Sequence, residues 1–162
     1  MDLSGSWNYI EKMARSRLAN NKTERHVSEY GEGIEVMGVA GEILARRCLG
    51  LNETVHKHFD GGYDFTFAGK KIDVKATHLT PRVSCRFLQW PLRKRIKADV
   101  ILMTAVDMVM KQGIVLGWVT EAEMMRSPIN RSRAEPCHEV PVPDLHPVYE
   151  LIALHLQLRT RL

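Results

Sequence analysis

The segment from Gly61 to Ala76 limits the possible folds most strongly, because polar and apolar residues alternate on both sides of a Gly-Lys pair. Such alternation predicts two antiparallel strands joined by a tight turn, with Gly69-Lys70 as its central residues. Since successive side chains of a strand point to opposite faces, one face is predicted to be apolar and buried: Tyr63, Phe65, Phe67, Ile72, Val74 and Ala76. A hairpin with such a face needs a second layer packed against it.

The opposite face of this hairpin is predicted to carry charged side chains, namely Asp64, Asp73 and Lys75. A turn at Gly69-Lys70 places Asp64 opposite Lys75, with Asp73 close by on the same face. Two neighbouring carboxylates repel each other unless a cation lies between them, and carboxylate sites of this kind suit Mg²⁺ or Mn²⁺. An ordinary solvent-exposed pair of opposite charges on neighbouring strands would give the same pattern.

Residues 32–49 predict an amphipathic helix, which could bring a third carboxylate, Glu42, to the hairpin. An exposed glutamate with no role is the alternative interpretation. The predicted buried face of this helix is apolar: Val36, Val39, Ala40, Ile43 and Leu44. Three glycines each lower helix stability by about 1 kcal/mol relative to alanine. They indicate close packing of the backbone or a frayed helix start: Gly33, Gly38 and Gly41.

The remaining periodicity predicts an α/β fold with a central mixed β-sheet of about five strands flanked by helices. Thr120 and Glu123 have the spacing of a capping box that starts a short helix through Met125. Residues 127–147 hold five prolines and predict a loop, after which Pro147 begins a last helix. The other predicted elements are a helix at 3–19 and strands at 63–67, 71–76, 83–90, 99–108 and 114–119.

Length and composition predict one globular domain over residues 1–162. Its predicted parts are the N-terminal helix, a core at about 32–125, and a C-terminal loop and helix at 126–162. The apolar and charged fractions, 44% and 26%, are unlike those of a disordered chain. Three cysteines make no disulfide framework, and no signal peptide or membrane-spanning run is visible. These features predict a cytoplasmic protein without a membrane partner.

Six basic residues fall within the 16 residues from 82 to 97: Arg82, Arg86, Arg93, Lys94, Arg95 and Lys97. Together with the net charge of +4, they favour contacts with the phosphates of a nucleic acid. A solvated, exposed loop would account for the same charges. The stretch directly follows the predicted hairpin, and Lys94 is the first choice for a contact close to it.

Other residues suggest a second kind of site. His56 and His58 would share one face of a strand and could bind Zn²⁺, and Cys137, His138 and His146 are further candidates. No partner pair at a suitable spacing supports either set. Two tryptophans and one histidine are interpreted as core residues: Trp90, Trp118 and His155. Trp90 beside the basic stretch could also stack on a base.

The order of a helical glutamate, an aspartate and an Asp-x-Lys motif resembles the PD-(D/E)XK nuclease superfamily, which has the restriction-endonuclease-like fold. The residues that carry this resemblance are Glu42, Asp64 and Asp73-Val74-Lys75, within about residues 32–125. The stretch from Gly38 to Gly50 is similar to the Gly-x-x-Gly-Glu helix of small phage and bacterial members. Tyr63 stands where the pattern of the superfamily has a proline.

The resemblance implies a Mg²⁺-dependent deoxyribonuclease, an endonuclease or resolvase-like enzyme that leaves 5′-phosphate and 3′-hydroxyl ends. It implies that Glu42, Asp64, Asp73 and the Val74 carbonyl bind one or two metal ions, and that Lys75 acts on the attacking water. The partner would be DNA, with RNA and a homodimer left open, in a bacterial or phage-infected cell. A catalytically inactive nucleic-acid-binding module and a zinc-stabilised interaction protein are the alternatives.

Overall fold

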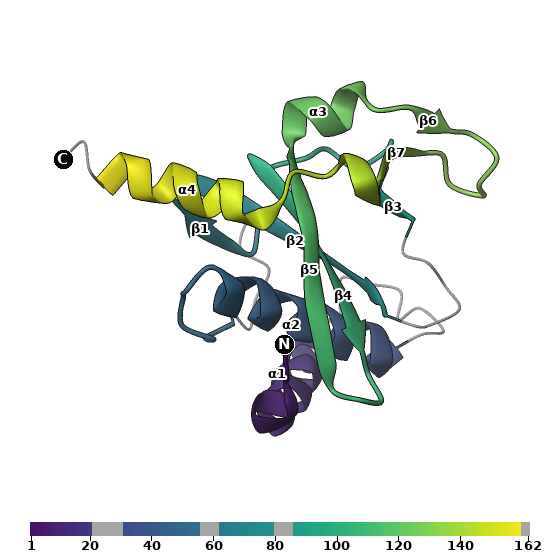
Figure 1. Ribbon diagram of the computed structural model, residues 1–162. Helices are drawn as coiled ribbons and strands as arrows, with labels where there is room; N and C mark the ends of the chain where they lie inside the picture. Colours follow the sequence, from purple (N-terminus) through teal and green to yellow (C-terminus); the bar gives the residue numbers. More distant parts are fainter. Residues whose placement is uncertain (21–30, 56–61, 80–85, 160–162) are drawn as a thin grey trace.

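The computed structural model of the protein describes residues 1–20, 31–55, 62–79 and 86–159 (Figure 1). The helices of these segments are α1 (Trp7–Asn20), α2 (Gly31–Cys48), α3 (Glu121–Arg126) and α4 (Val148–Arg159), with 3-10 turns at Ser4–Ser6 and Val142–Asp144. The strands are β1 (Phe65–Phe67), β2 (Lys70–His78), β3 (Phe87–Pro91), β4 (Val100–Asp107), β5 (Gln112–Thr120), β6 (Ile129–Asn130) and β7 (Cys137–Pro141). None of the described helices is long and apolar enough to cross a membrane.

Two sheets form the β structure of the described segments. The first is mixed, with the order β1-β2-β4-β5, in which β2 and β4 are parallel and the outer pairs are antiparallel. The second is antiparallel, with the order β3-β7-β6. The α/β class and the mixed sheet are therefore confirmed.

The prediction of about five strands in one sheet is wrong, because β3 leaves the central sheet to pair with β7. This partner lies inside 127–147, the segment predicted to be a loop from its prolines. The strand Cys137–Pro141 tolerates its proline because Pro141 is the final residue, where a missing N–H costs no ladder bond inside the strand. The prolines of this segment therefore led to the wrong prediction of a loop where β7 lies.

The β1–β2 hairpin turns one residue earlier than predicted, at Ala68-Gly69 instead of Gly69-Lys70. Both turn residues have positive φ, 52° for Ala68 and 74° for Gly69, as a tight two-residue hairpin turn requires. The register of the two strands is displaced by two residues from the predicted one. Each side chain therefore keeps its predicted face of the hairpin but has a different partner on the other strand. Asp64, whose backbone N–H donates to the Ile72 carbonyl, comes to the level of Asp73 and not of Lys75.

The predicted apolar face of the hairpin is buried as expected at Phe65, Phe67, Ile72 and Val74. These side chains pack with residues from the end of α2 and from α4. Tyr63 is an exception, because it packs with a different cluster, formed between the two sheets. Its ring lies under the Lys71 ammonium, 5.4 Å from the ring centroid.

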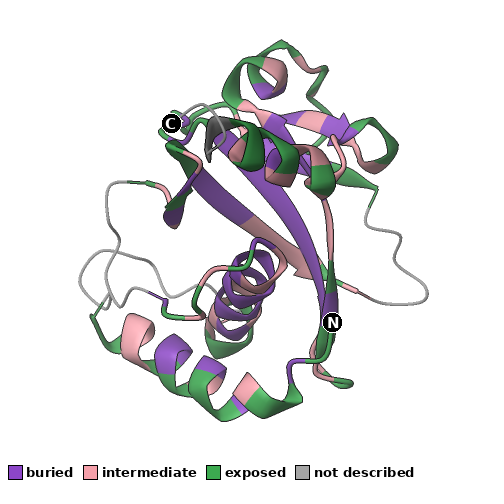
Figure 2. Cartoon of the chain, turned by 60° about the vertical axis from the view of Figure 1, so that its left-hand side comes forward, coloured by how far each residue is buried: buried purple, intermediate pink, exposed green. Residues whose placement is uncertain are grey.

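Helices α1, α2 and α4 lie on one side of the first sheet, and the second sheet and α3 lie on the other side. Helix α2 lies against β2, β4 and β5, and α1 packs on the outside of α2. Figure 2 shows buried residues along the strands and α2, with exposed residues on the outer side of α1. Behind the sheet, Leu88 and Trp90 of β3 pack with Ile101 and Met103 of β4. The charged residues of β2 face this second layer.

Gly41 is the point where α2 lies closest to the sheet. A Cβ atom at Gly41 would come within 2.5 Å of Thr104 Oγ1 and 2.7 Å of Ala76 Cβ, whereas one at Gly38 would meet nothing within 4 Å. The same is true of Gly33. Of the three glycines in the predicted helix, only Gly41 is explained by a close backbone approach. This contact fixes the height of α2, and with it Glu42, over β2.

The predicted helix ends agree closely with the structure. The capping box at Thr120 and Glu123 is present, with Thr120 Oγ1 accepting from the Glu123 backbone N–H. Helix α4 begins at Val148, directly after Pro147, as predicted. The predicted helices 3–19 and 32–49 correspond to the first 3-10 turn with α1 and to α2. Caps and helical periodicity were thus reliable guides here.

Candidate active site

A cavity of about 540 Å³ opens where α1, α2 and β2 meet the residues that precede β1 and those that follow β3. Four acidic side chains line it: Glu35, Glu42, Asp64 and Asp73. Four basic side chains beside Lys75 also line it: Arg17, Lys94, Arg95 and Lys97. The predicted quartet of Glu42, Asp64, Asp73 and Lys75 is therefore brought to one cavity, although its members come from three separate segments.

Asp64 and Asp73 are neighbouring, buried carboxyl groups in this cavity. Asp64 Oδ2 accepts a hydrogen bond of 2.6 Å from the Val74 backbone N–H. Removal from water, together with the negative charges of Glu42 and Asp73, raises the pKa of Asp64 to about 8. The pKa of Asp73 is also raised, by burial, while the charge of Lys75 and a hydrogen bond from Asp64 oppose the shift. Burial and the neighbouring negative charges therefore favour the protonated form of Asp64, whereas a bound cation would favour its ionised form.

The predicted register placed Lys75 opposite Asp64. In the structure Lys75 instead lies beside Asp73. Its ammonium donates a 2.6 Å hydrogen bond to Asp73 Oδ1 and lies 4.8 Å from the centroid of the Trp90 ring. The Trp90 indole N–H in turn donates to the Lys94 carbonyl at 2.7 Å. Trp90 itself is 5% exposed, which confirms that it belongs to the core. The contact between the Trp90 ring and the Lys75 ammonium helps to hold that ammonium beside Asp73.

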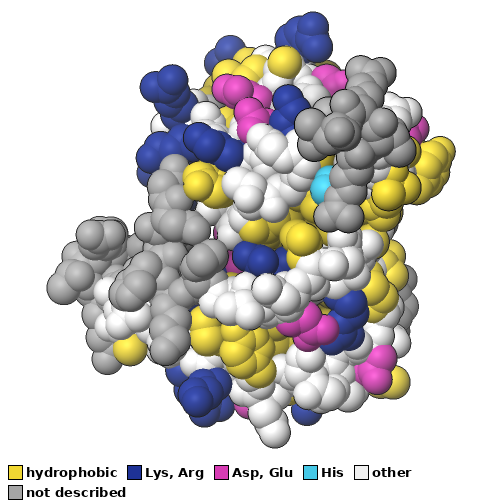
Figure 3. Space-filling model, turned by 90° about the vertical axis from the view of Figure 1, so that its left-hand side faces the viewer, with side chains coloured by type: hydrophobic (Ala, Val, Ile, Leu, Met, Phe, Trp, Pro, Cys, Tyr) yellow, Lys and Arg dark blue, Asp and Glu magenta, His cyan; other side chains and the backbone are white. Residues whose placement is uncertain are grey.

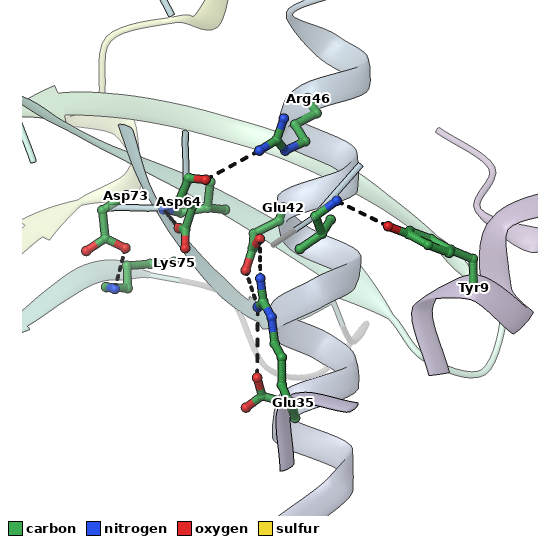
Figure 4. A network of polar contacts seen from close by, with 10 residues as sticks. Tyr9, Glu35, Glu42, Arg46, Asp64, Asp73 and Lys75 are labelled. Carbon is green, nitrogen blue, oxygen red and sulfur yellow. Dashed lines mark hydrogen bonds and ion pairs between the residues drawn. The ribbon is translucent and has the colours of Figure 1, made fainter. Parts of the chain in front are cut away.

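Glu42 reaches the cavity from α2, but an arginine binds its carboxylate. Arg17 of α1 donates to both oxygens, at 2.5 Å and 2.8 Å, and its Nη1 lies 3.9 Å from Glu35 Oε1. Figure 4 shows Asp64 between Asp73 and Glu42, with Glu35 further along α2. Burial raises the pKa of Glu42, and the charge of Arg17 opposes that shift. The charge of Arg17 thus stabilises the ionised form of Glu42, which burial alone would disfavour.

Arg17 was missed by the sequence reading, although a signal for it was present. The buried residues of α1 include Ile10 and Ala14, and Arg17 follows them at helical spacing. A basic residue that continues an apolar stripe predicts a buried acidic partner. The partner could not be named from the sequence, because it lies 25 residues away on another helix.

The donor set fits a divalent cation in part. Among the described residues, no group of three or more His, Cys, Asp or Glu side chains is arranged to hold a metal ion. Asp64 and Asp73 supply two neighbouring carboxyl groups, and Mg²⁺ or Mn²⁺ would bind them in their deprotonated form. Glu42 would join them once Arg17 releases it. The role of the Val74 carbonyl stays a prediction, and the Val74 N–H orients Asp64.

Three of the six predicted basic residues lie at the cavity. Lys94, Arg95 and Lys97 are exposed and line it, and Figure 3 shows several Lys and Arg side chains gathered at one edge of the face it draws. Arg93 instead binds Glu135. Arg86 is exposed at the start of β3, and Arg82 lies outside the described residues. The basic rim of the cavity therefore consists of Lys94, Arg95 and Lys97, and includes fewer residues than the sequence predicted.

No known family, curated protein or solved structure matches this chain. The resemblance to PD-(D/E)XK nucleases therefore rests on the residues named above and stays a prediction.

The zinc candidates make other contacts where they are described. His138 is buried, with Nδ1 3.1 Å from the Ser127 carbonyl oxygen. His146 Nε2 lies 2.8 Å from Glu123 Oε1, and its ring stacks on Trp118 with centroids 4.7 Å apart. His155, predicted to be a core residue, is half-buried against Phe67. His56 and His58 lie outside the described segments.

The raised pKa of Asp64 predicts that the metal-free protein loses stability as the pH rises. Between the usual value of 3.8 and about 8, the folded chain keeps a proton that the unfolded chain has released. Stability therefore falls by up to about 1.4 kcal/mol per pH unit in this window. Urea unfolding in EDTA at pH 5 to 8 measures the slope, and Asp64→Asn is expected to flatten it.

Asp144→Asn is the matched control for this measurement, because Asp144 is exposed and lies outside the cavity. It should leave the slope of the parent protein unchanged. An Asp64→Asn variant whose stability falls with pH as steeply as that of the parent would contradict the raised pKa of Asp64.

Proposed function

We propose that this protein is a divalent-metal-dependent nuclease that hydrolyses phosphodiester bonds in DNA. The observation that carries the proposal is the Asp64–Asp73 pair, with Lys75 bound to it, inside a cavity whose rim is basic. Two adjacent acids, an ammonium and a positive rim fit a phosphodiester: the acids suit a metal ion, and the cations suit the phosphates. An ordinary surface ion pair would not place a buried carboxyl such as that of Asp73 in a cavity.

In this proposal Asp64 and Asp73 hold Mg²⁺ or Mn²⁺, with Glu42 as a third ligand and the Val74 carbonyl as a further one. The bound ion would polarise the scissile phosphate and lower the pKa of a water molecule. Lys75 would donate hydrogen bonds to the attacking water or to the phosphate oxygens, where negative charge develops. Asp73 and Trp90 hold its ammonium in place for this role.

The rim residues Lys94, Arg95 and Lys97 would hold the nucleic-acid backbone, so that the scissile bond lies over the carboxyl pair. The cavity has open space above Gly38, where no atom would meet a side chain within 4 Å. The products would carry 5′-phosphate and 3′-hydroxyl ends, as the resemblance implies.

A catalytically inactive DNA-binding module is the second candidate, and one observation favours it. Both oxygens of Glu42 are bound by Arg17, so the third metal ligand is already in use. A module of this kind would keep the basic rim and bind DNA with or without a divalent ion. The two candidates therefore differ in their requirement for metal.

A cleavage assay separates them. Supercoiled plasmid and labelled linear, single-stranded and branched DNA, with RNA for comparison, are incubated with the protein in Mg²⁺, Mn²⁺, Ca²⁺ or EDTA. We expect cleavage in Mg²⁺ and Mn²⁺ and none in EDTA. A gel shift without cleavage under every condition would support the binding module and reject the nuclease.

The basic rim gives a separate prediction. The triple variant Lys94→Gln, Arg95→Gln, Lys97→Gln is expected to bind DNA more weakly and to lower the slope of log affinity against log salt by about 2 to 3. Fluorescence anisotropy in Ca²⁺ at several salt concentrations measures the slope. Arg93→Gln is the control, because Arg93 binds Glu135 and does not line the cavity. Equal slopes for the triple variant and the parent would exclude these residues as phosphate contacts.

A further inference from the structure

The contact between Arg17 and Glu42 is the feature of the cavity that the proposed function does not explain. The two side chains are 12% and 6% exposed, and the guanidinium binds both carboxylate oxygens. Glu35 lies on the other side of the same guanidinium. A buried, bidentate ion pair between an arginine and a carboxylate is among the stronger polar contacts in proteins.

This contact uses the lone pairs that a metal ion would need. A divalent cation ligated by Asp64, Asp73 and Glu42 would have to displace Arg17 from at least one Glu42 oxygen. Arg17 also places a positive charge near Asp64, because the two groups interact electrostatically. The arginine and a divalent ion therefore compete for one acid.

We infer that Arg17 is a positioning residue whose hold on Glu42 sets how tightly the cavity takes a divalent ion. The inference rests on the proposed function and extends it to the control of metal affinity. Arg17 comes from α1 and Glu42 from α2, so metal binding is linked to the packing of these two helices. When the acid is available in only a fraction of the molecules, the apparent affinity for its ligand falls by that fraction.

Mn²⁺ binding tests the inference without any measurement of cleavage. The metal-stripped protein is titrated with Mn²⁺, and the free ion is followed by electron paramagnetic resonance. We expect Arg17→Gln to bind Mn²⁺ about tenfold more tightly than the parent, or tighter still, because Glu42 is then released. Arg17→Lys keeps the charge but loses the fork that fits a carboxylate, so an intermediate affinity is expected. If Arg17→Gln does not fold, Arg17→Lys carries the test.

A double-mutant cycle separates the action of Arg17 through Glu42 from the loss of a nearby positive charge. In a Glu42→Gln background, Arg17→Gln should change the affinity for Mn²⁺ by less than about threefold. Lys94→Gln is the matched control, because Lys94 lines the same cavity and interacts with Asp73 without contacting Glu42. It should tighten Mn²⁺ binding much less than Arg17→Gln does.

The outcomes distinguish this inference from the proposed function. If the parent binds Mn²⁺ and Arg17→Gln binds it equally well, the inference is wrong and the nuclease proposal stands. The inference is also wrong if the cycle shows no coupling or if Lys94→Gln has the same effect. If the parent and every variant fail to bind Mn²⁺, both the inference and the proposed function are wrong.

Discussion

Asp73→Asn is expected to lower the rate of the proposed DNA cleavage at least about 1,000-fold, because it removes a proposed metal ligand and the acceptor that holds Lys75. The amide has almost the size of the carboxylate, so the core around β2 should stay intact.

Single-turnover cleavage of a labelled substrate in Mg²⁺ measures this effect, with a thermal melt in EDTA on the same samples. Asp99→Asn is the control, since Asp99 is exposed and lies outside the cavity, and an asparagine can still accept from the Lys71 backbone N–H. A folded Asp73→Asn protein that cleaves within tenfold of the parent rate would reject Asp73 as part of the active site.

Gly41→Val is expected to cause the largest loss of stability, about 3 kcal/mol in the free energy of unfolding. Its side chain would overlap Thr104 Oγ1 and Ala76 Cβ, so α2 would have to move away from the paired strands β2 and β4 and lose packing against them. The gain in helix propensity on replacing glycine, below about 1 kcal/mol, is smaller than this cost.

Gly38→Ala supplies the matched comparison one turn earlier on α2. Its methyl group would meet no atom within 4 Å, so a gain of about 0.5 to 1 kcal/mol is expected. Urea unfolding at one pH measures both variants. Equal effects at the two positions would mean that the close approach of α2 to the sheet does not determine stability.

Several parts of this architecture could be predicted because they depend on local chemistry. The faces of the hairpin follow from the alternation of Phe65, Phe67, Ile72 and Val74, and a register error of two residues leaves such faces unchanged. The α3 capping box needs only Thr120 and Glu123 at the right spacing. The same alternation predicted that Asp64, Asp73 and Lys75 share one face of the hairpin segment, and all three line the cavity.

The parts that could not be predicted depend on distant or uncommon choices. A turn at Ala68-Gly69 needs a positive φ at an alanine. Sequence rules expect glycine or asparagine at such a position, so they do not select this turn. The pairing of β3 with β7 joins residues about 50 positions apart, and nothing local selects it. Arg17 likewise finds Glu42 only through the packing of α1 on α2. The partners of Asp64 and Glu42 therefore required the structure.

Trp90 belongs to the second sheet, yet its ring faces Lys75 of the first sheet and its N–H binds the backbone at Lys94. One rigid indole thus spans the seam between the two layers. Sliding of one layer over the other would change the Lys75 contact and the position of the Lys94 backbone at the same time. One side chain therefore couples the two walls of the cavity mechanically.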